Sequence, residues 1–400
     1  MTASSNDDDL IFECYSDPEL KRWTHLANAK AWKGILTVQQ YADREQLLGS
    51  SEISQKNKSN EMMTKYPKSY QWLGQKYFVL KDRSLPDNGK FSQVVSSCET
   101  LNRIGYCIHP GSNGKIEPAL IVCIGGVFTF ENHRGKGYAK KMIIKLNEFY
   151  DKIRDDANTV LELKNLVINL YSEVGEYYSA LGYESMHVPL HRISKLDELT
   201  ERYCGEDDDH DGKYLGFDDY RGLVGLHETQ FKESLLSLHK ENPEKFVFTV
   251  APDFDIFTWF QYRDLFIMNK SGRRAQQDLF FGYALSDNSH IIWHHNWNGD
   301  SLIIVKIHIP EETFQRKELK LKKLLRKAIE ETKLHGLQEL EFWDEEIPIK
   351  KYPQLFQLLT ELENESKVFS ENGSINAVRP PKGYTAEQVI WDNNTKFCWF

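Results

Sequence analysis

A strand-like run that ends in a glycine-punctuated loop and then opens a helix most strongly constrains the fold of this sequence. Leu120–Phe130 is apolar and rich in branched and aromatic residues, which is typical of a strand. Glu131–His133 interrupt the run, and Gly135 and Gly137 follow. Apolar residues then recur at helical spacing, namely Ala139, Met142, Ile143, Leu146, Phe149 and Ile153. Because free backbone N–H groups and the helix dipole favour an anion at a helix start, the pattern predicts a phosphate site.

The loop differs from two common nucleotide motifs. It lacks the Lys-Ser/Thr ending of a P-loop, and its glycines do not follow the dinucleotide pattern. Arg134–Ala139 instead resembles the Arg-x-x-Gly-x-Ala signature of the GCN5-related N-acetyltransferase (GNAT) superfamily; the alternative is an ordinary strand-to-helix turn. The resemblance implies acetyl-CoA as co-substrate, with its pyrophosphate in the loop. The cofactor-binding residues expected from it are Phe128, Thr129, Arg134, Gly135, Lys136, Gly137, Tyr138 and Ala139.

A second motif strengthens this resemblance. Asn165–Leu170 is an almost wholly apolar run typical of a strand that is buried on both faces. Tyr178–Tyr183 follows it and fits the Tyr-x-x-x-Gly-Phe/Tyr segment that GNAT proteins often carry after their fifth strand. The resemblance covers roughly residues 8–195. It implies an α+β fold, with a mixed, largely antiparallel sheet flanked by helices.

Short segments also resemble a narrower group, the fungal lysine N-acetyltransferase-like proteins. They are Ser97–Thr100, Val127–Thr129 and His133–Ala139, and a long C-terminal extension accompanies them. Characterised members of that group acetylate the side-chain amine of free lysine, so the resemblance implies this reaction here. Phe130–Glu131 departs from the pattern, because prolines are expected there.

The chain is long enough for two domains, and its charge pattern suggests where they divide. Residues 8–200 are expected to form the acetyltransferase domain, and the acidic run within 201–213 a linker. Residues 214–400 are predicted to form strands at 245–250, 254–266, 279–285, 290–293, 302–309 and 340–343, with helices at 223–239 and 321–336. This order resembles a degenerate second GNAT-like lobe. It lacks the CoA signature after Ile309–Glu312, so no cofactor is assigned to it.

Two residues are the catalytic candidates. Tyr178 holds the position that the superfamily uses for the acid that protonates the leaving thiolate; the alternative is a packing role. Glu99 is the candidate base, because a hairpin about residues 111–114 would place it opposite Gly125 and Gly126. This glycine pair indicates a strand bulge, beside which backbone N–H groups near Thr129 would face the thioester. A solvent-facing Glu99 is the alternative, and His133 is the next candidate base.

Composition limits the other classes of ligand. The net charge of -9 disfavours nucleic-acid binding and favours a cationic substrate. His290, His294 and His295 have no cysteine or carboxylate at a spacing that completes a metal site, so none is expected. Neither a signal peptide nor a membrane span is expected, since Met1–Leu10 is acidic and no apolar run reaches about 18 residues. Scattered cysteines predict reduced thiols in the cytoplasm or nucleus.

The expected function is therefore N-acetyl transfer from acetyl-CoA to free lysine or a similar small cationic amine. Two alternatives remain open. One is acetylation of a protein or a polyamine, and the other is a CoA-binding pseudoenzyme that regulates without turnover. The sequence does not indicate an oligomeric state.

Overall fold

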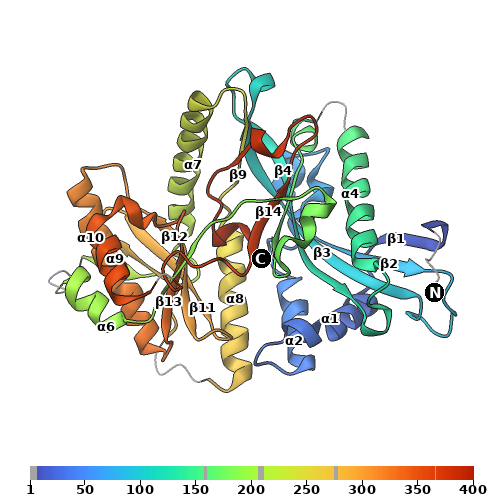
Figure 1. Cartoon of the computed structure of the whole chain (residues 1–400), viewed down its shortest axis with the longest axis horizontal. Coiled ribbons are helices and arrows are strands. Elements are labelled where there is room, and N and C mark those ends of the chain that lie inside the picture. The colour runs from blue at the N-terminus through green and yellow to red at the C-terminus, as the bar shows by residue number, and fades with distance from the viewer. Residues whose placement is uncertain (1–6, 157–159, 206–210, 274–277, 365) are drawn as a thin grey trace.

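The computed structural model describes residues 7–156, 160–205, 211–273, 278–364 and 366–400. It has the expected α+β architecture, with two largely antiparallel sheets flanked by helices. The two sheets lie side by side in separate halves of the molecule, and the C-terminus lies between them (Figure 1). Among the described residues, no helix combines the length and apolarity that a membrane span requires.

The first sheet is built mainly from the N-terminal half. Its strand order is β1-β2-β3-β4-β5-β14-β6, and β9 and β15 extend it beside β3. The bounds are β1 Leu10–Tyr15, β2 Gly74–Asp82, β3 Val94–Ile108, β4 Glu117–Thr129, β5 Val167–Ser172, β6 Glu184–Ser185, β9 Phe246–Val250, β14 Ile375–Arg379 and β15 Val389–Trp391. The helices of this half are α1 Pro18–Trp32, α2 Val38–Leu48, α3 Asn60–Lys65, α4 Tyr138–Asp156 and α5 Leu161–Lys164.

Strand β4 contributes apolar side chains to both faces of this sheet. Leu120, Val122 and Ile124 pack in the same apolar cluster as α4, whereas Ile121 and Cys123 belong to the cluster on the opposite face. This alternation follows from the two-residue period of a strand. Burial on both faces accounts for the nearly continuous apolar run that predicted the strand.

The predicted hairpin and its bulge are confirmed. Ser97 pairs with Phe128 and Glu99 pairs with Gly125, so β4 holds one more residue than β3 between these two pairs. Gly126 lies in this bulge with φ +57°, a left-handed conformation that glycine adopts without the strain of a side chain. Parallel pairing between β4 and β5 ends at Ile124 and Leu170, although both strands continue. The two strands therefore separate beside the bulge.

The second sheet repeats this arrangement in the C-terminal half. Its order is β7-β13-β12-β11-β10-β8. The bounds are β7 Leu190–Ile193, β8 Gly212–Tyr214, β10 Gly282–Leu285, β11 His290–Asn296, β12 Ser301–His308 and β13 Glu339–Trp343. β11 and β12 form an antiparallel hairpin with a bulge in β12. A long helix, α9 Phe314–Leu334, then leads to β13, which lies parallel to β12. β3, β4, α4 and β5 follow the same order, as predicted for a second GNAT-like lobe.

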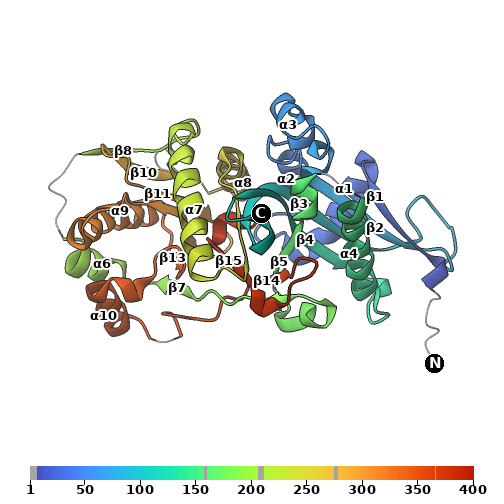
Figure 2. The same cartoon turned by 90° about the horizontal axis from the view of Figure 1, so that it is seen from above.

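Each sheet also receives strands from the other half of the chain. β7 precedes the expected linker but lies in the second sheet, while β9, β14 and β15 follow the linker and lie in the first. Figure 2 shows β14 beside β5, far from the rest of the C-terminal lobe. The division of the chain into two domains at residues 200 and 214 therefore remains a prediction. Residues 206–210 of the expected acidic linker lie outside the described residues.

The extended segment expected at 254–266 is wrong, because α8 spans Phe254–Ser271 as a helix. Asp253 caps it by accepting a hydrogen bond from the Asp255 N–H. The buried residues of this helix are Ile256, Phe257, Thr258, Trp259, Phe260, Gln261, Asp264, Ile267 and Met268. The first six are consecutive and cover every side of the helix for more than a turn, so periodicity does not distinguish this part from a buried strand. The other helices of this half are α6 Leu196–Leu199, α7 Arg221–Glu241 and α10 Pro353–Leu362.

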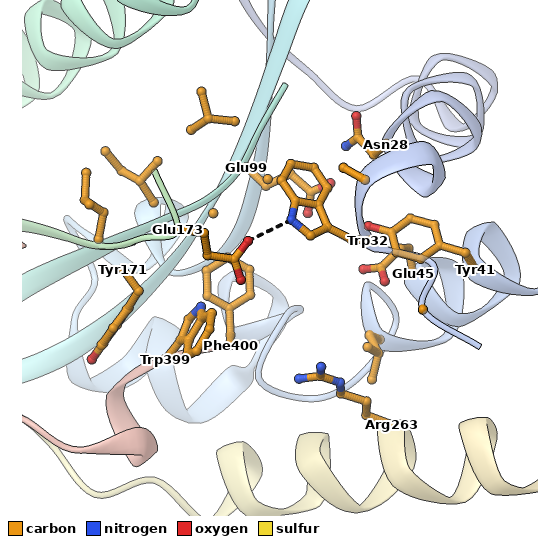
Figure 3. A pocket seen from close by; sticks show the side chains of 18 of the residues that line it. Asn28, Trp32, Tyr41, Glu45, Glu99, Tyr171, Glu173, Arg263, Trp399 and Phe400 are labelled. Atoms are coloured by element: carbon orange, nitrogen blue, oxygen red, sulfur yellow. Dashed lines mark hydrogen bonds between the residues drawn. The ribbon is translucent and has the colours of Figure 1, made fainter. Parts of the chain in front are cut away.

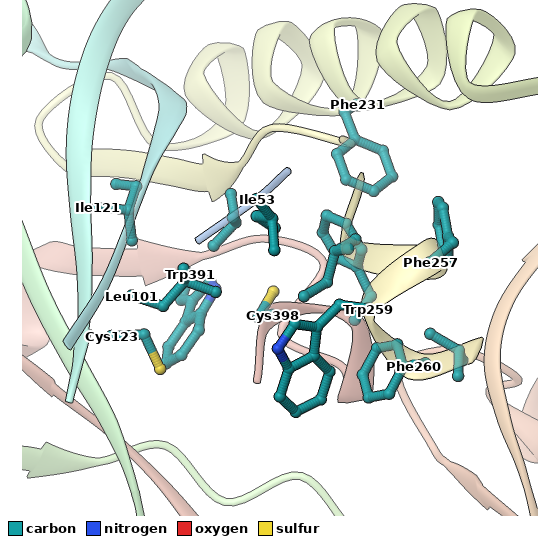
Figure 4. Close-up of a cluster of buried hydrophobic side chains, with 14 of the residues drawn as sticks. Ile53, Leu101, Ile121, Cys123, Phe231, Phe257, Trp259, Phe260, Trp391 and Cys398 are labelled. Carbon is teal, nitrogen blue, oxygen red and sulfur yellow. The ribbon is translucent and has the colours of Figure 1, made fainter. Parts of the chain in front are cut away.

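One apolar cluster joins the two halves. Figure 4 shows Leu101, Ile121 and Cys123 of the first sheet near Trp391 and Cys398 of the C-terminal segment, with Trp259 of α8 beside them. Burial of these side chains on both sides of the boundary opposes separation of the halves, at about 25 cal/mol for each Å² removed from water. The cluster therefore fixes α8 and the C-terminal segment against the bulged strand β4.

Candidate active site

A pocket of ≈ 440 Å³ opens where β4 and β5 separate. Both halves of the chain line it, and Figure 3 shows their side chains converging. The polar and aromatic lining residues include Asn28, Trp32, Tyr41, Arg44, Glu45, Glu99, Tyr171, Glu173, Tyr178, Trp259, Arg263, Lys396, Trp399 and Phe400. Gly125 and Gly126 form the floor on the bulged strand. The Phe400 ring packs so closely on Gly125 that an added Cβ would lie 2.9 Å from its Cζ.

The structure brings the two catalytic candidates, Glu99 and Tyr178, into this pocket. The Glu99 side chain lies against the bulge, since a Cβ added at Gly126 would be 3.7 Å from its Cγ. His25 of α1 contacts one Glu99 oxygen from 2.8 Å, and the Gln75 amide donates to the other. Glu99 is only 8% exposed, so it is not the solvent-facing residue that the alternative required. Its role as a base stays a prediction.

His25 is a partner that the sequence did not reveal. Burial disfavours its charged form, but the Glu99 carboxylate outweighs burial and raises the pKa of His25 above its usual value. The pair therefore holds a carboxylate in the pocket while the imidazole balances its charge. The contact joins residues 74 positions apart, and no local pattern marks it.

Tyr178 lies in the 3-10 helix Gly175–Leu181, which ends at Gly182 in the left-handed conformation, as predicted. The side chain is half-buried and packs against the Tyr177 and Tyr183 rings. Burial raises the pKa of the Tyr178 phenol well above its usual value. The phenol is therefore protonated at neutral pH, as a proton donor must be.

The glycine loop between β4 and α4 is open to an anion. Gly135 and Gly137 have φ values of +77° and +79°, and a Cβ added at either would meet no atom within 4 Å. Lys136 between them is exposed. This loop leads directly into α4, a helix of 19 residues. The geometry fits a phosphate held by backbone N–H groups at a helix N-terminus.

The remaining loop residues divide into packing and positioning roles. Phe128 and Tyr138 are buried, and the Tyr138 hydroxyl donates to Asp82, so their side chains belong to the core. The Arg134 Nε donates to the Thr129 carbonyl from 3.2 Å, and its guanidinium lies 5.3 Å from the centroid of the Phe128 ring. Ala139 is half-buried in the first turn of α4. Any contact of Phe128 or Tyr138 with a bound phosphate would therefore come from the backbone.

His133 and the segment 50–66 lie elsewhere. Neither lines the pocket beside Gly126, and burial lowers the pKa of His133. The polar, Lys/Ser/Asn-rich composition of 50–66 predicts a loop over the site, but this prediction is wrong. Part of the segment is helical, Ile53 is fully buried, and its polar side chains line a different pocket with Arg103 and Asp253. The apolar anchor at Ile53 fixes a segment that composition alone described as polar.

Charged side chains of both signs line the pocket. Trp32 donates from Nε1 to Glu173 at 3.0 Å, and Arg44 donates from Nε to Glu45 at 2.8 Å. Burial opposes ionisation of Glu45, yet Arg44 outweighs it and keeps the pKa of Glu45 below its usual range. On the wall formed by the C-terminal half, Arg263 and Lys396 bring nitrogen donors. Arg263 extends from α8 into the pocket in Figure 3.

Lys396 is unusual because its ammonium is almost fully buried. The side chain is 6% exposed, and its Nζ lies 3.6 Å from the centroid of the Trp399 ring. Burial lowers the pKa of Lys396 well below its usual value. A negatively charged ligand group nearby would favour its charged form. The wall of Arg263 and Lys396 is therefore suited to a carboxylate.

Comparisons with known proteins agree with this fold. The family model described as LYC1 GNAT-like C-terminal domain matches residues 200–400. The chain is 99% identical to the Saccharomyces cerevisiae protein YGR111W over 400 residues, which is 100% of both chains. It is 25% identical over 249 residues to a Yarrowia lipolytica protein named lysine acetyltransferase, a match that covers 53% of this chain and 59% of that one. A GCN5-related N-acetyltransferase from Anabaena variabilis shares the fold, with a TM-score of 0.50 and 11% identity over 92% of this chain and 72% of that one. The chain belongs to the LYC1 GNAT-like family and is an acyltransferase of the GNAT superfamily.

Proposed function

We propose that the chain transfers an acetyl group from acetyl-CoA to the side-chain amine of free lysine or a similar small cationic amine. The pocket carries the proposal, because three carboxylates (Glu45, Glu99 and Glu173) line it together with Arg263 and Lys396. Free lysine has a side-chain ammonium and an α-carboxylate at opposite ends, so both groups would find opposite charge. A volume of ≈ 440 Å³ suits an acceptor of this size. The named activity of the Yarrowia lipolytica relative supports the same acceptor.

The glycine loop supports acetyl-CoA as the donor. Backbone N–H groups at Gly135–Ala139 would hold the pyrophosphate, with Lys136 adding positive charge. The pantetheine arm would then follow the separation between β4 and β5 to the bulge at Gly126. Bound there, acetyl-CoA would supply a thioester carbonyl beside Glu99 and Tyr178.

The residues of the pocket account for each proton in the proposed transfer. Glu99 attracts the lysine ammonium and accepts one of its protons, directly or through a water molecule, which frees the nitrogen lone pair. Backbone N–H groups beside the bulge stabilise the oxyanion that forms when the amine attacks the carbonyl. Tyr178 donates its phenolic proton to the departing thiolate as the carbon–sulfur bond breaks. The nitrogen releases its second proton to water as the tetrahedral adduct collapses to the amide. Solvent then takes the proton from Glu99 and returns one to the Tyr178 phenolate, so one proton is released overall.

Gly137→Asp should weaken acetyl-CoA binding by about 10–100-fold, because it adds a negative charge beside the pyrophosphate. Gly137→Asn is the matched control, since both residues tolerate a left-handed φ and differ only in charge. Calorimetry on the two variants checks the prediction. Equal affinity in wild type and Gly137→Asp would place the pyrophosphate somewhere else.

The acceptor is tested by following CoA thiol release with lysine, with cadaverine and with a lysine-containing peptide. Cadaverine is lysine without its α-carboxylate, so it isolates the contribution of that group. We expect lysine to have the highest kcat/KM. Preference for cadaverine or for the peptide would instead indicate a polyamine or protein acetyltransferase. Tight acetyl-CoA binding without release for any amine would indicate a pseudoenzyme.

Arg263→Gln should lower kcat/KM for lysine by about 10–100-fold, the typical effect of losing a charged hydrogen bond. The same variant should leave kcat/KM for cadaverine nearly unchanged, since cadaverine has no carboxylate to bind. Arg263→Lys keeps the charge and should recover part of the lysine activity. An equal loss for lysine and cadaverine would mean that Arg263 supports the pocket without recognising the α-carboxylate.

A further inference from the structure

Two histidines and a glutamate converge in the C-terminal half, and none of them lines the active-site pocket. His295 lies on β11, and Glu331 and His335 lie at the C-terminal end of α9. The Glu331 Oε1 is 3.0 Å from the His295 Nε2 and 3.2 Å from the His335 Nε2. All three side chains are at most 2% exposed. A buried group of three potential ligands therefore faces a single point.

Hydrogen bonding alone leaves this cluster incompletely satisfied. The Glu331 Oε1 accepts hydrogen bonds from the Phe280 N–H and the His295 Nε2. The buried His335 Nε2 is close to the same oxygen but has no hydrogen-bond partner among the described residues. The buried His295 Nδ1 has none either. A buried ring nitrogen without a partner is costly, so the His335 Nε2, which faces the Glu331 oxygen, calls for a physical explanation.

The spacing of the three atoms fits a metal ion between them. Zinc binds histidine nitrogen and carboxylate oxygen at about 2.0–2.2 Å in tetrahedral sites, which places neighbouring ligand atoms about 3.3 Å apart. The two nitrogen–oxygen separations here, 3.0 and 3.2 Å, are close to that value. Glu331 and His335 are four residues apart, so they lie on one face of the helix end, a spacing that metal ligands use.

Asp264 and Trp297 hold the His295 ring in place. Asp264 accepts the His295 backbone N–H at 2.6 Å, and its Oδ2 lies 3.8 Å from the His295 Nδ1. A carboxylate behind the second ring nitrogen favours the tautomer in which Nε2 is free to bind a metal. The Trp297 ring stacks on the imidazole, with centroids 5.2 Å apart and an interplanar angle of 14°. These contacts hold the Nε2 edge toward Glu331.

We propose that His295, Glu331 and His335 bind a divalent transition-metal ion, with zinc as the best match, which ties the end of α9 to β11. Nitrogen and carboxylate ligands without thiolates suit zinc among the common metals. A water molecule would complete the tetrahedron. The charges of Glu331 and Asp264 balance a divalent cation, so the ion would be neutralised where it is buried.

The test uses the full-length protein after treatment with a chelator. Elemental analysis after equilibration with micromolar zinc should find one zinc per chain, and the thermal midpoint should rise with zinc concentration. Cobalt in place of zinc should give the visible absorption bands of a tetrahedral site. Trp297 fluorescence should change on titration, because the indole stacks on a ligand. Wild-type protein that binds no zinc at micromolar concentration would overturn the proposal.

Glu331→Gln and His335→Asn should abolish stoichiometric zinc binding and the zinc-dependent rise in thermal midpoint. The glutamine can still accept the Phe280 N–H, so it removes the charge while keeping that contact. His187→Gln is the control, since His187 forms an exposed pair with Glu176 that could bind zinc weakly. Zinc binding that survives in Glu331→Gln but is lost in His187→Gln would assign the ion to the surface.

Discussion

Tyr178→Phe should lower kcat by about 10²–10⁴-fold, the usual contribution of a general acid–base group, while leaving acetyl-CoA affinity unchanged. The variant removes one hydroxyl and little volume. Because burial raises the pKa of Tyr178, the wild-type phenol is protonated at neutral pH and able to donate to the thiolate. Steady-state CoA release gives kcat, and calorimetry gives the affinity for acetyl-CoA.

Tyr177→Phe is the matched control for this experiment. Tyr177 lies in the same 3-10 helix with its ring 5.2 Å from that of Tyr178, but it is 43% exposed and does not line the pocket. Its variant should keep wild-type kcat. If Tyr178→Phe and Tyr177→Phe behave alike, Tyr178 is a packing residue and the acid must be found elsewhere.

Local signals in the sequence predict the N-terminal half of the fold, which carries the glycine loop. The capping box at Thr37 and Gln40 begins α2, and the turn after Ile108 sets the register that places Glu99 opposite Gly125. Both depend on contacts between residues that are near in sequence or joined by one tight turn. The bulge follows from the same logic, because a glycine pair inside a strand tolerates the extra residue.

Helix α8 shows where such signals fail. Its aromatic residues alternate with polar ones closely enough to resemble a strand, but continuous burial over Ile256–Gln261 removes the amphipathic stripe there. The error affects the site, because Trp259 and Arg263 lie on this helix and line the pocket. In a strand, residues four apart share a face but lie about 13 Å apart, whereas in a helix they are neighbours.

The pocket residues from the C-terminal half could not be placed from the sequence. Lys396 and Trp399 reach the pocket because β14 and β15 return to the first sheet and pack beside it. These strands pair with partners that are far away in the sequence, and the apolar cluster between the halves fixes the pairing. The sequence shows that Glu331 and His335 are four residues apart. It does not show that His295, from a different element, lies beside them.

Glu99→Gln should lower kcat/KM for lysine at pH 7 by about 10²-fold or more, because it removes both the base and the charge that attracts the ammonium. The deficit should shrink as pH rises toward 9, since the lysine amine has a pKa of about 10.4 and its free fraction increases about tenfold per pH unit. Rate–pH profiles of CoA release for wild type and variant give the ratio. Glu13→Gln, an exposed change on β1, is the control.

Stability measurements separate this catalytic effect from a folding defect, because the two depend on pH in different ways. The raised pKa of His25 means that its pairing with Glu99 stabilises the folded state below the unfolded pKa of about 6.5, and that this contribution is lost as pH rises through the raised value. Glu99→Gln should therefore destabilise the protein most below pH 6.5 and less at pH 8–9. A kcat/KM deficit that persists at pH 8, where the variant is folded by urea titration, would belong to catalysis. Wild-type kcat/KM from pH 6 to 9 would instead make Glu99 a structural partner of His25 and Gln75 only.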